Sequence, residues 1–436
     1  MMTAKPVLQR HRRRQKTPWL KRLLWLEPGW LLVLAPSLLF TDYFWEPTLR
    51  PLFIMALFLF WPLRLKTGQA LLPRGAAGWF LGFLLLWLPV TVWQSPDTTH
   101  AWEVAGYVYF AFTTFVALSH WSFLHEHPQW LVFLLLAIGV GLAIVGPETF
   151  SVNPDKVLDI YRTEEFSLVD PSFRGETINP NILGGVLVFL MPLGIALARP
   201  WPWARWRWWP LLLWAPVLFM GNALILSQSR SSWVALLVAS LLLCWFFWPH
   251  FTTGLALIAL IGGGLVWWQY DVNAFLDNEI LRSAQASLNL RLTIWRLSLH
   301  LIADHPLIGI GLGNFKATFA AYFPNIPLIG GQFAPPHAHN LFVQLALDLG
   351  LPGLLAYLGL IATLIRSLLV RLQAKNRGDT LAYPLAIGVI SACTALVVVG
   401  GFDNALWGTK LLVIPWCLLA LAYQLGDPKN SNASLI

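Results

Sequence analysis

Charged residues are scarce in this chain, and their scarcity excludes an ordinary soluble protein. Of the 436 residues, 57% are hydrophobic and only 11% are charged, whereas a soluble domain carries about 25% charged residues. The mean hydropathy is +0.62. We therefore predict an all-α polytopic membrane protein whose spans each hold roughly 20 mostly apolar residues.

Cysteines are also few, and their placement excludes two kinds of site. Cys244, Cys393 and Cys417 all lie inside apolar stretches, and the chain has no Cys-x-x-Cys motif. Neither a disulfide framework nor a thiolate metal site is therefore expected. We predict no cofactor and no metal.

Basic residues exceed acidic ones, giving a net charge of +8. Lys and Arg gather near the ends of apolar stretches, so membrane orientation explains the excess, and no nucleic-acid partner is expected. Residues 1–27 are basic and lack a small-residue cleavage site after a short apolar core. We interpret them as a cytoplasmic tail and not as a cleaved signal.

The apolar stretches predict twelve spans, of which the second is short. Basic loops near residues 64–74, 199–207 and 366–377 alternate with acidic loops, and positive charge marks the cytoplasmic side. An even number of spans then places both termini in the cytoplasm. The predicted spans are 28–45, 48–64, 76–95, 101–121, 129–148, 180–199, 209–228, 232–249, 251–270, 340–371, 380–400 and 405–425.

Five regions follow from this pattern. They are the tail at 1–27, spans one to nine within 28–270 with an outer loop at 149–179, a long extracytoplasmic loop at 271–339, the last three spans within 340–425, and a cytoplasmic tail at 426–436.

The long loop contains a predicted amphipathic helix from Leu281 to Ile302. Leucines and a tryptophan recur there at helical spacing, at Leu288, Leu292, Trp295 and Leu299. Such a helix is expected to lie along the outer membrane surface with its apolar face toward lipid. The sequence His305-Pro306 is expected to end it.

A histidine stands where this loop meets the tenth predicted span. His339 and Asn340 precede an apolar run that reaches Gly350. Histidine changes charge near neutral pH, and an ionisable group at the edge of a membrane helix is a candidate functional residue. The alternative is an interfacial histidine without a catalytic role.

Neighbouring residues refine this prediction. Gly350-Leu351-Pro352-Gly353 predicts a kink that leaves room for a substrate groove. His337 and His339 could suggest a metal, but without a nearby carboxylate or cysteine they make a weak site. Asp348 lies about half a helical circumference from His339 and is not expected to orient that ring.

A glycine run precedes the histidine, with Gly309, Gly311 and Gly313 at alternate positions. Such a run can mimic a phosphate loop. No strand is predicted before it and no Lys-Ser/Thr follows it, so we do not predict nucleotide binding.

Three arginines are predicted on the same membrane face as His339. Arg230 lies between spans seven and eight, Arg291 on the amphipathic helix, and Arg174 before span six. A guanidinium presents a planar fork of donors that suits phosphate and diphosphate. For each arginine alone, the alternative is snorkelling or a surface ion pair.

Four motifs together resemble the O-antigen ligase and O-antigen polymerase superfamily. They are Ser229-Arg230-x-x-Trp233, Arg291-x-x-x-Trp295, the run from Asp304 to Phe315, and His339-Asn340-x9-Gly350-x-x-Gly353. The motif-bearing region covers roughly residues 174–370, and the first five spans resemble the family only in hydropathy.

The resemblance implies transfer of a glycan from a polyprenyl-diphosphate carrier to an acceptor hydroxyl on a glycan, lipid or protein. The reaction is expected at the outer face of the bacterial inner membrane, without metal or nucleotide sugar. His339 is implied as the catalytic residue, with Arg230 and Arg291 binding the diphosphate and Arg174 as a weaker candidate. His337 is outside the pattern.

Two other classes remain open at this point. Twelve spans also permit a small-solute or bicarbonate transporter, although the chain shows no similar halves and few charges inside its spans. A structural or assembly subunit is the third hypothesis, but it leaves the basic residues and the histidine on one face unexplained. The motifs do not separate ligase from polymerase.

Overall fold

The computed structural model describes residues 18–40, 45–149, 179–198, 209–254, 256–258, 261, 279–324, 334–373, 381–404 and 406–426. Every regular element within these ranges is a helix, which confirms the predicted all-α class. The first half contains α1 (Pro18–Leu23), η1 (Leu24–Leu26), α2 (Glu27–Leu39), η2 (Pro47–Leu49), α4 (Arg50–Leu57), α5 (Trp61–Thr67), α6 (Ala76–Gln94), α7 (Thr98–His120), α8 (Ser122–Glu126), α9 (Gln129–Val145) and η3 (Gly146–Thr149).

The second half contributes the helices around the long loop and the last spans. These are α10 (Pro180–Leu197), α11 (Trp209–Leu226), α12 (Arg230–Phe247), α15 (Glu279–Asp304), α16 (Phe315–Tyr322), α17 (Leu341–Gln373), α18 (Ala382–Gly400), η7 (Lys410–Leu412) and α19 (Val413–Gly426).

Eight helical segments in the described part of the chain are long and apolar enough to cross a membrane. Three shorter apolar helices lie at Gln129–Val145, Leu212–Leu226 and Lys410–Gly426. The protein is therefore multi-pass, but the predicted number of twelve spans is not confirmed. The predicted span at 251–270 lies largely outside the described residues, and the first apolar helix begins at Trp19, earlier than the predicted residue 28.

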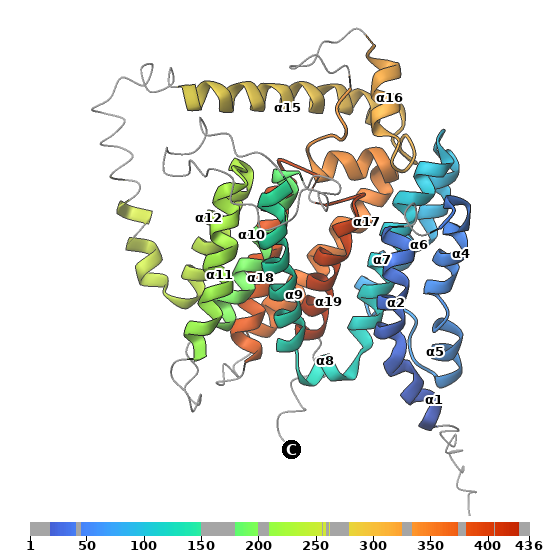
Figure 1. The fold of residues 1–436 in the computed structure, drawn as a ribbon, viewed down its shortest axis with the longest axis horizontal. Coiled ribbons are helices and arrows are strands. Elements are labelled where there is room, and N and C mark those ends of the chain that lie inside the picture. Colours follow the sequence, from blue (N-terminus) through green and yellow to red (C-terminus); the bar gives the residue numbers. More distant parts are fainter. Residues whose placement is uncertain are drawn as a thin grey trace, which may run out of the picture.

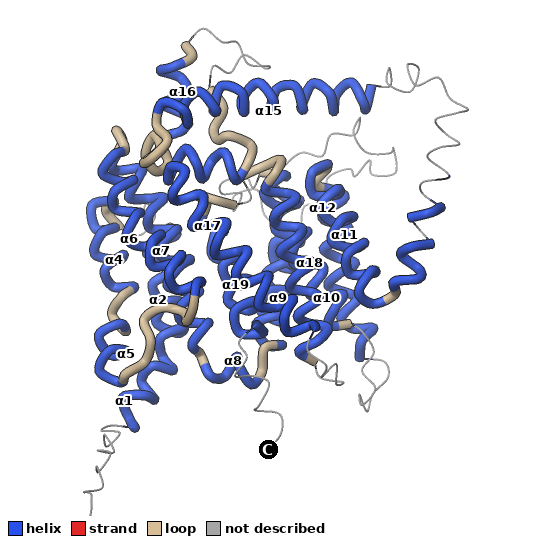
Figure 2. Tube along the Cα trace, turned by 180° about the vertical axis from the view of Figure 1, so that it is seen from behind, coloured by secondary structure: helices blue, strands red, loops and turns tan. Residues whose placement is uncertain are grey.

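The spans form a bundle with two groups of helices. One group packs α10 against α9, α11, α12 and α18, and the other packs α7 against α2, α4, α6 and α19. Both views show α19, with α17 beside it, on the side of the second group that faces the first group (Figures 1 and 2). The core is therefore continuous across the bundle.

The two ends of the bundle differ in architecture. Figure 1 shows α15 lying across the upper ends of the spans, with α16 beside it. The lower end carries α1, α5 and α8. The predicted amphipathic helix at 281–302 is thus present as Glu279–Asp304, and it ends just before His305-Pro306, as expected.

The exposed leucines of α15 follow the predicted apolar face, whereas the tryptophan does not. Leu288, Leu292 and Leu299 are 42%, 48% and 59% exposed, while Ile294 and Leu301 are buried. Trp295 instead turns its indole N–H toward the chain before α17. Contact between the leucines and lipid stays a prediction.

Helix α17 is kinked at Gly350, as the sequence predicts. Gly350 adopts φ 70° and ψ 175° inside the helix, a conformation that only glycine adopts readily. The Leu349 carbonyl next to the kink accepts a hydrogen bond from Trp87 Nε1 at 2.8 Å. The kink separates a first helical part, buried under α15 and α16, from the long descending part (Figure 1).

The backbone of the glycine run before α17 packs directly against the backbone of α17 at this kink. Ile310 N donates to Leu347 O at 2.7 Å and Leu351 N donates to Pro306 O at 2.8 Å. A Cβ atom on Gly309 would lie 2.1 Å from Leu347 O, and one on Gly350 would lie 2.0 Å from the carbonyl oxygen of Leu307. Close backbone packing therefore accounts for these glycines without a phosphate.

Candidate active site

The histidine motif forms a strained turn at the start of α17. His339 has φ 49°, in the left-handed region that residues other than glycine rarely adopt. Asn340 follows and caps the helix, because its Oδ1 accepts from the backbone N–H groups of Phe342 and Val343 at 3.0 and 3.1 Å. Its Nδ2 donates to Gly401 O at 3.0 Å. Asn340 thus joins the turn to the end of α18.

Two further side chains hold the same turn. His337 Nδ1 accepts a hydrogen bond from the His339 backbone N–H at 3.2 Å. Trp295 Nε1 on α15 donates to Ala338 O at 3.0 Å and to His339 O at 3.3 Å. Because α15 and α18 both reach this turn, the direction of the His339 ring depends on packing between three helices.

A carboxylate faces both histidines, which corrects one step of the sequence reasoning. Asp403 Oδ1 lies 3.7 Å from His337 Nδ1 and 3.8 Å from His339 Nδ1. The sequence makes the histidine pair a weak metal site only because no carboxylate stands near it in the chain. Asp403 comes from the loop after α18, and the polar pair Asp403-Asn404 between two predicted spans is the signal that could have found it.

The polar groups around this loop keep Asp403 ionised. Burial would raise the pKa of Asp403, but the two imidazoles that face it and the Asn404 N–H outweigh burial and hold its pKa below the ordinary value. Burial also lowers the pKa of His337 to about 4, although the Asp403 carboxylate acts in the opposite direction. At neutral pH, His337 is therefore neutral and Asp403 is negative.

The ring of His339 keeps one unused polar atom. Its Nδ1 is buried and has no hydrogen-bond partner among the described residues, and 3.8 Å from Asp403 Oδ1 is beyond hydrogen-bond range. A buried polar atom without a partner is uncommon and calls for an explanation. A small movement of either residue would complete an Asp–His pair, which leaves the other ring nitrogen of His339 free to take a proton.

Backbone strain marks three loops at the upper end of the bundle. Among described residues other than glycine, only Gln228, His339 and Leu406 have positive φ. Gln228 precedes Ser229-Arg230, His339 is in the histidine turn, and Leu406 follows Asp403-Asn404. Strained residues of this kind cluster at active sites because the surrounding fold must enforce them.

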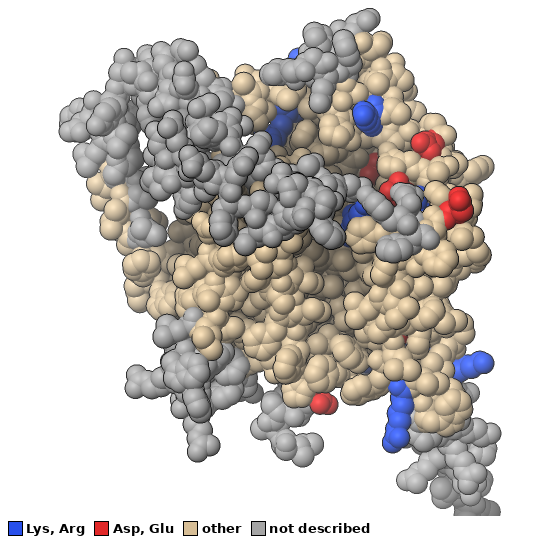
Figure 3. All heavy atoms as spheres, in the orientation of Figure 1, with Lys and Arg blue, Asp and Glu red and all other residues tan. Residues whose placement is uncertain are grey.

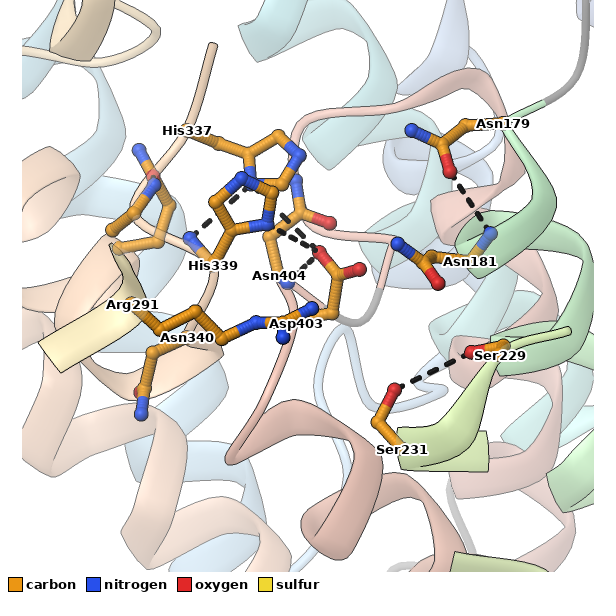
Figure 4. Close-up of polar contacts among 12 residues, drawn as sticks. Asn179, Asn181, Ser229, Ser231, Arg291, His337, His339, Asn340, Asp403 and Asn404 are labelled. Carbon is orange, nitrogen blue, oxygen red and sulfur yellow. Dashed lines mark hydrogen bonds and ion pairs between the residues drawn. The ribbon is translucent and has the colours of Figure 1, made fainter. Parts of the chain in front are cut away.

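Arg291 is part of the histidine cluster. It projects from α15 beside His339 and Asp403 (Figure 4), and its charge acts on His337. Nη1 donates to Ser287 Oγ at 2.7 Å, whereas Nε is buried and finds no hydrogen-bond acceptor in the described part of the chain. Arg291 therefore retains a donor for a ligand.

Of the other two predicted arginines, the structure describes only Arg230. Arg230 is the first residue of α12, between Ser229 and Ser231, which lie across from Asp403 in Figure 4. Arg174 lies outside the described residues. Figure 3 shows the surface hollowed at the upper end, below α15 and α16, with both basic and acidic atoms on its wall.

Asn179 and Asn181 line the same side of the site as the serines of α12 (Figure 4). Asn179 caps α10 by accepting from Asn181 N at 2.9 Å. Amide and hydroxyl groups of this kind can hydrogen-bond the hydroxyls of a sugar without adding charge.

Three donor atoms of the cluster could also hold a metal ion. Atoms of His337, His339 and Asp403 all lie within 4.8 Å of one another. Donors on zinc stand about 2 Å from the metal and so roughly 3.4 Å from each other, and His337 Nδ1 is already a hydrogen-bond acceptor. A metal ion and an Asp–His hydrogen bond would each require these side chains to approach, so the expectation of a metal-free reaction rests on the family resemblance.

The helices and this cluster define a class: a multi-pass helical membrane protein with a histidine, a carboxylate and arginine together at one end. Residues 215–358 match the family model described as O-Antigen ligase. This match supports a relationship to the O-antigen ligase and polymerase superfamily and agrees with the resemblance found in the motifs. The match covers less than half of the chain but includes Arg230, Arg291 and His339. No curated protein matches the chain.

Proposed function

We propose that the protein transfers a glycan from a polyprenyl-diphosphate carrier to an acceptor hydroxyl. One observation carries this proposal: within the O-antigen ligase domain, the fold brings His339 and Arg291 together with Asp403 at one end of the membrane bundle. The acceptor is a glycan, a lipid or a protein hydroxyl. The family match supports this function over the transporter hypothesis.

In the proposed reaction His339 is the general base. An acceptor hydroxyl is a poor nucleophile, and a neutral imidazole makes it a better one by taking its proton during attack. The hydroxyl oxygen forms a bond to the anomeric carbon while the bond from that carbon to the diphosphate oxygen breaks. Asp403 faces Nδ1, so the other ring nitrogen receives the proton and the ionised carboxylate stabilises the imidazolium.

Arginine stabilises the leaving group. The polyprenyl diphosphate departs with the bonding electrons, and fixed guanidinium groups lower the energy of that developing negative charge. The buried Nε–H of Arg291 without a hydrogen-bond partner among the described residues supports this role, and we assign Arg230 to the same diphosphate. Direct attack in one step inverts the anomeric configuration.

The membrane setting follows from the same proposal. The upper end of the bundle faces outward from a bacterial inner membrane, with both termini in the cytoplasm, and the carrier enters laterally from the bilayer. The kink of α17 and the hollow beneath α15 supply space for a lipid-linked substrate. No metal takes part in the step.

The direct test is transfer by the purified protein in liposomes that contain a polyprenyl-diphosphate glycan and an acceptor. We expect a product of inverted anomeric configuration by NMR, formed at the same rate with and without EDTA. Retained configuration would contradict single displacement, and loss of activity in EDTA would contradict the metal-free step. Carrier-independent solute uptake without glycan transfer would favour a transporter.

A further inference from the structure

Asp348 is a buried carboxylate in the first part of α17 that the proposed reaction does not use. Its exposed fraction is 2%, and its surroundings on the helix are leucines and alanine. Burying an ionisable group is costly unless its oxygens are well paired. Both oxygens are paired here: Oδ1 accepts from Gln344 Nε2 at 3.0 Å and Oδ2 accepts from Trp407 Nε1 at 2.8 Å.

The first of these hydrogen bonds leads to the histidine turn. Gln344 lies one helical turn before Asp348, and its Oε1 accepts from the backbone N–H of Ala338 at 2.8 Å. Ala338 stands between His337 and His339 and is fully buried. The amide of Gln344 is therefore oriented at one end by the turn and at the other end by Asp348.

The second hydrogen bond leads to the loop of Asp403. Trp407 O accepts from Asn404 Nδ2 at 3.2 Å, and Asn404 N donates to Asp403 Oδ1 at 2.8 Å. Trp407 itself is 2% exposed, so its indole has one fixed position. Asp348 is thus linked to the histidine turn through Gln344 and to the Asp403 loop through Trp407.

We propose that Asp348 is a positioning residue that sets the distance between His339 and Asp403. It touches neither residue, which agrees with its place about half a helical circumference from His339, but it holds both loops through Gln344 and Trp407. The inference rests on the proposed function, because it assigns Asp348 to the base of that reaction. It also explains why a carboxylate is retained in an apolar part of the bundle.

The chemistry of the partners explains why an acid is needed here. Gln344 Nε2 and Trp407 Nε1 are both donors, so the residue between them must accept twice. An asparagine at this position would turn an N–H group toward one of the two donors, and one of the loops would lose its support. The change in volume is small, so Asp348→Asn tests the hydrogen bonding and not the packing.

The experiment compares two variants with wild type in the liposome transfer assay. We expect Asp348→Asn to lower kcat at least about tenfold, because small misplacement of catalytic groups has large effects on rate, with less than about a twofold change in KM for the carrier. The double variant Gln344→Glu with Asp348→Asn exchanges acid and amide. It restores the hydrogen bonds to Ala338 and Trp407, since the new carboxylate accepts from Ala338 N and from the new amide one turn later, whose carbonyl oxygen accepts from Trp407 Nε1. Its kcat should recover to within about threefold of wild type.

The matched control is Glu27→Gln, which also changes a buried carboxylate to an amide but lies at the lower end of the bundle, in contact with Arg64. It should leave kcat unchanged. Wild-type kcat in folded Asp348→Asn, or an exchanged double variant that folds but stays as slow as Asp348→Asn, would overturn the inference. His339→Ala separates the two proposals: if that variant remains active, the proposed function fails; if it is inactive while Asp348→Asn is normal, only the positioning role fails.

Discussion

Two buried carboxylates at opposite ends of the bundle are paired in different ways. At the lower end, Glu27 accepts from Arg64 Nε at 3.1 Å and also from its Nη2, and Arg64 Nη1 reaches Ala70 O. At the upper end, Asp403 faces His337 and His339 at 3.7 and 3.8 Å without a hydrogen bond to either ring.

The difference is the one expected if the lower pair serves stability and the upper cluster serves the proposed reaction. A complete buried pair such as Glu27 and Arg64 leaves no polar capacity for a ligand, and breaking it costs about 3–5 kcal/mol. The upper cluster keeps an unused donor, Nε of Arg291, and an unused nitrogen, Nδ1 of His339, among the described residues. Catalytic hydrogen bonds are often long in the absence of substrate and shorten when substrate binds, which agrees with these unpaired polar atoms.

The largest expected effect belongs to His339. His339→Ala should reduce kcat by about 10²–10⁴-fold, the usual contribution of a positioned base, while expression and membrane insertion stay normal. His337→Ala should cost much less, since His337 supports the turn and stands outside the motif. Transfer kinetics with both purified variants measure this ranking. An essential His337 with a dispensable His339 would mean that the motif is in the wrong register.

The arginines should come next. Arg291→Ala and Arg230→Ala are each expected to lower kcat/KM for the carrier about 10²-fold, and Arg→Lys to recover only part of it, because lysine lacks the bidentate fork. The assay varies the concentration of the lipid-linked donor at fixed acceptor. Normal kinetics in both alanine variants would contradict diphosphate binding at this end of the bundle.

The two carboxylates should separate activity from stability. Asp403→Asn removes the charge beside His339 and is expected to lower kcat about 10–100-fold with a loss of stability below about 1 kcal/mol. Glu27→Gln should do the reverse, with normal kcat and a lower thermal midpoint, because Arg64 remains buried beside a neutral partner. Thermal unfolding in detergent and transfer rates, measured on the same samples, test the contrast. Equal loss of stability in both variants would contradict it.

A further expected effect is on the stability of the protein in acid, through His337. Its pKa is about 4 in the folded protein against 6.5 for a free histidine, so the unfolded state binds the proton first as pH falls. The corresponding stability is complete above pH 6.5 and is lost as the pH falls toward 4, by up to about 3 kcal/mol. His337→Asn keeps an acceptor for the His339 N–H and should flatten this decline in thermal midpoint. A decline as steep as in wild type would exclude His337 as its source.

Local sequence signals predict much of this molecule. Hydropathy predicts the helical spans, helical spacing predicts α15, and Gly350 with Pro352 predicts the kink. Each of these features depends on residues within one or two turns of each other. The motifs likewise single out His339 and Arg291, which the structure places in one cluster.

Contacts between distant segments are beyond that reasoning. Asp403 lies near His339 only because α18 ends beside the histidine turn. Trp407, in the same loop after α18, contacts Asp348 only because this loop also lies against α17. Helical geometry excludes Asp348 from contact with the His339 ring, and the structure agrees. Helical geometry predicts only direct contacts, however, whereas Asp348 is connected to the histidine turn through Gln344.

We propose that the upper cluster is an open site that closes on a lipid-linked diphosphate. A cryo-electron microscopy structure with a non-transferable polyprenyl-diphosphate glycan tests it most directly. The account predicts the diphosphate against Arg291 and Arg230, with His339 Nδ1 and Asp403 Oδ1 drawn from 3.8 Å to about 2.8 Å, within hydrogen-bond range. A diphosphate bound elsewhere, or a metal ion between His337, His339 and Asp403 in the active complex, would contradict it.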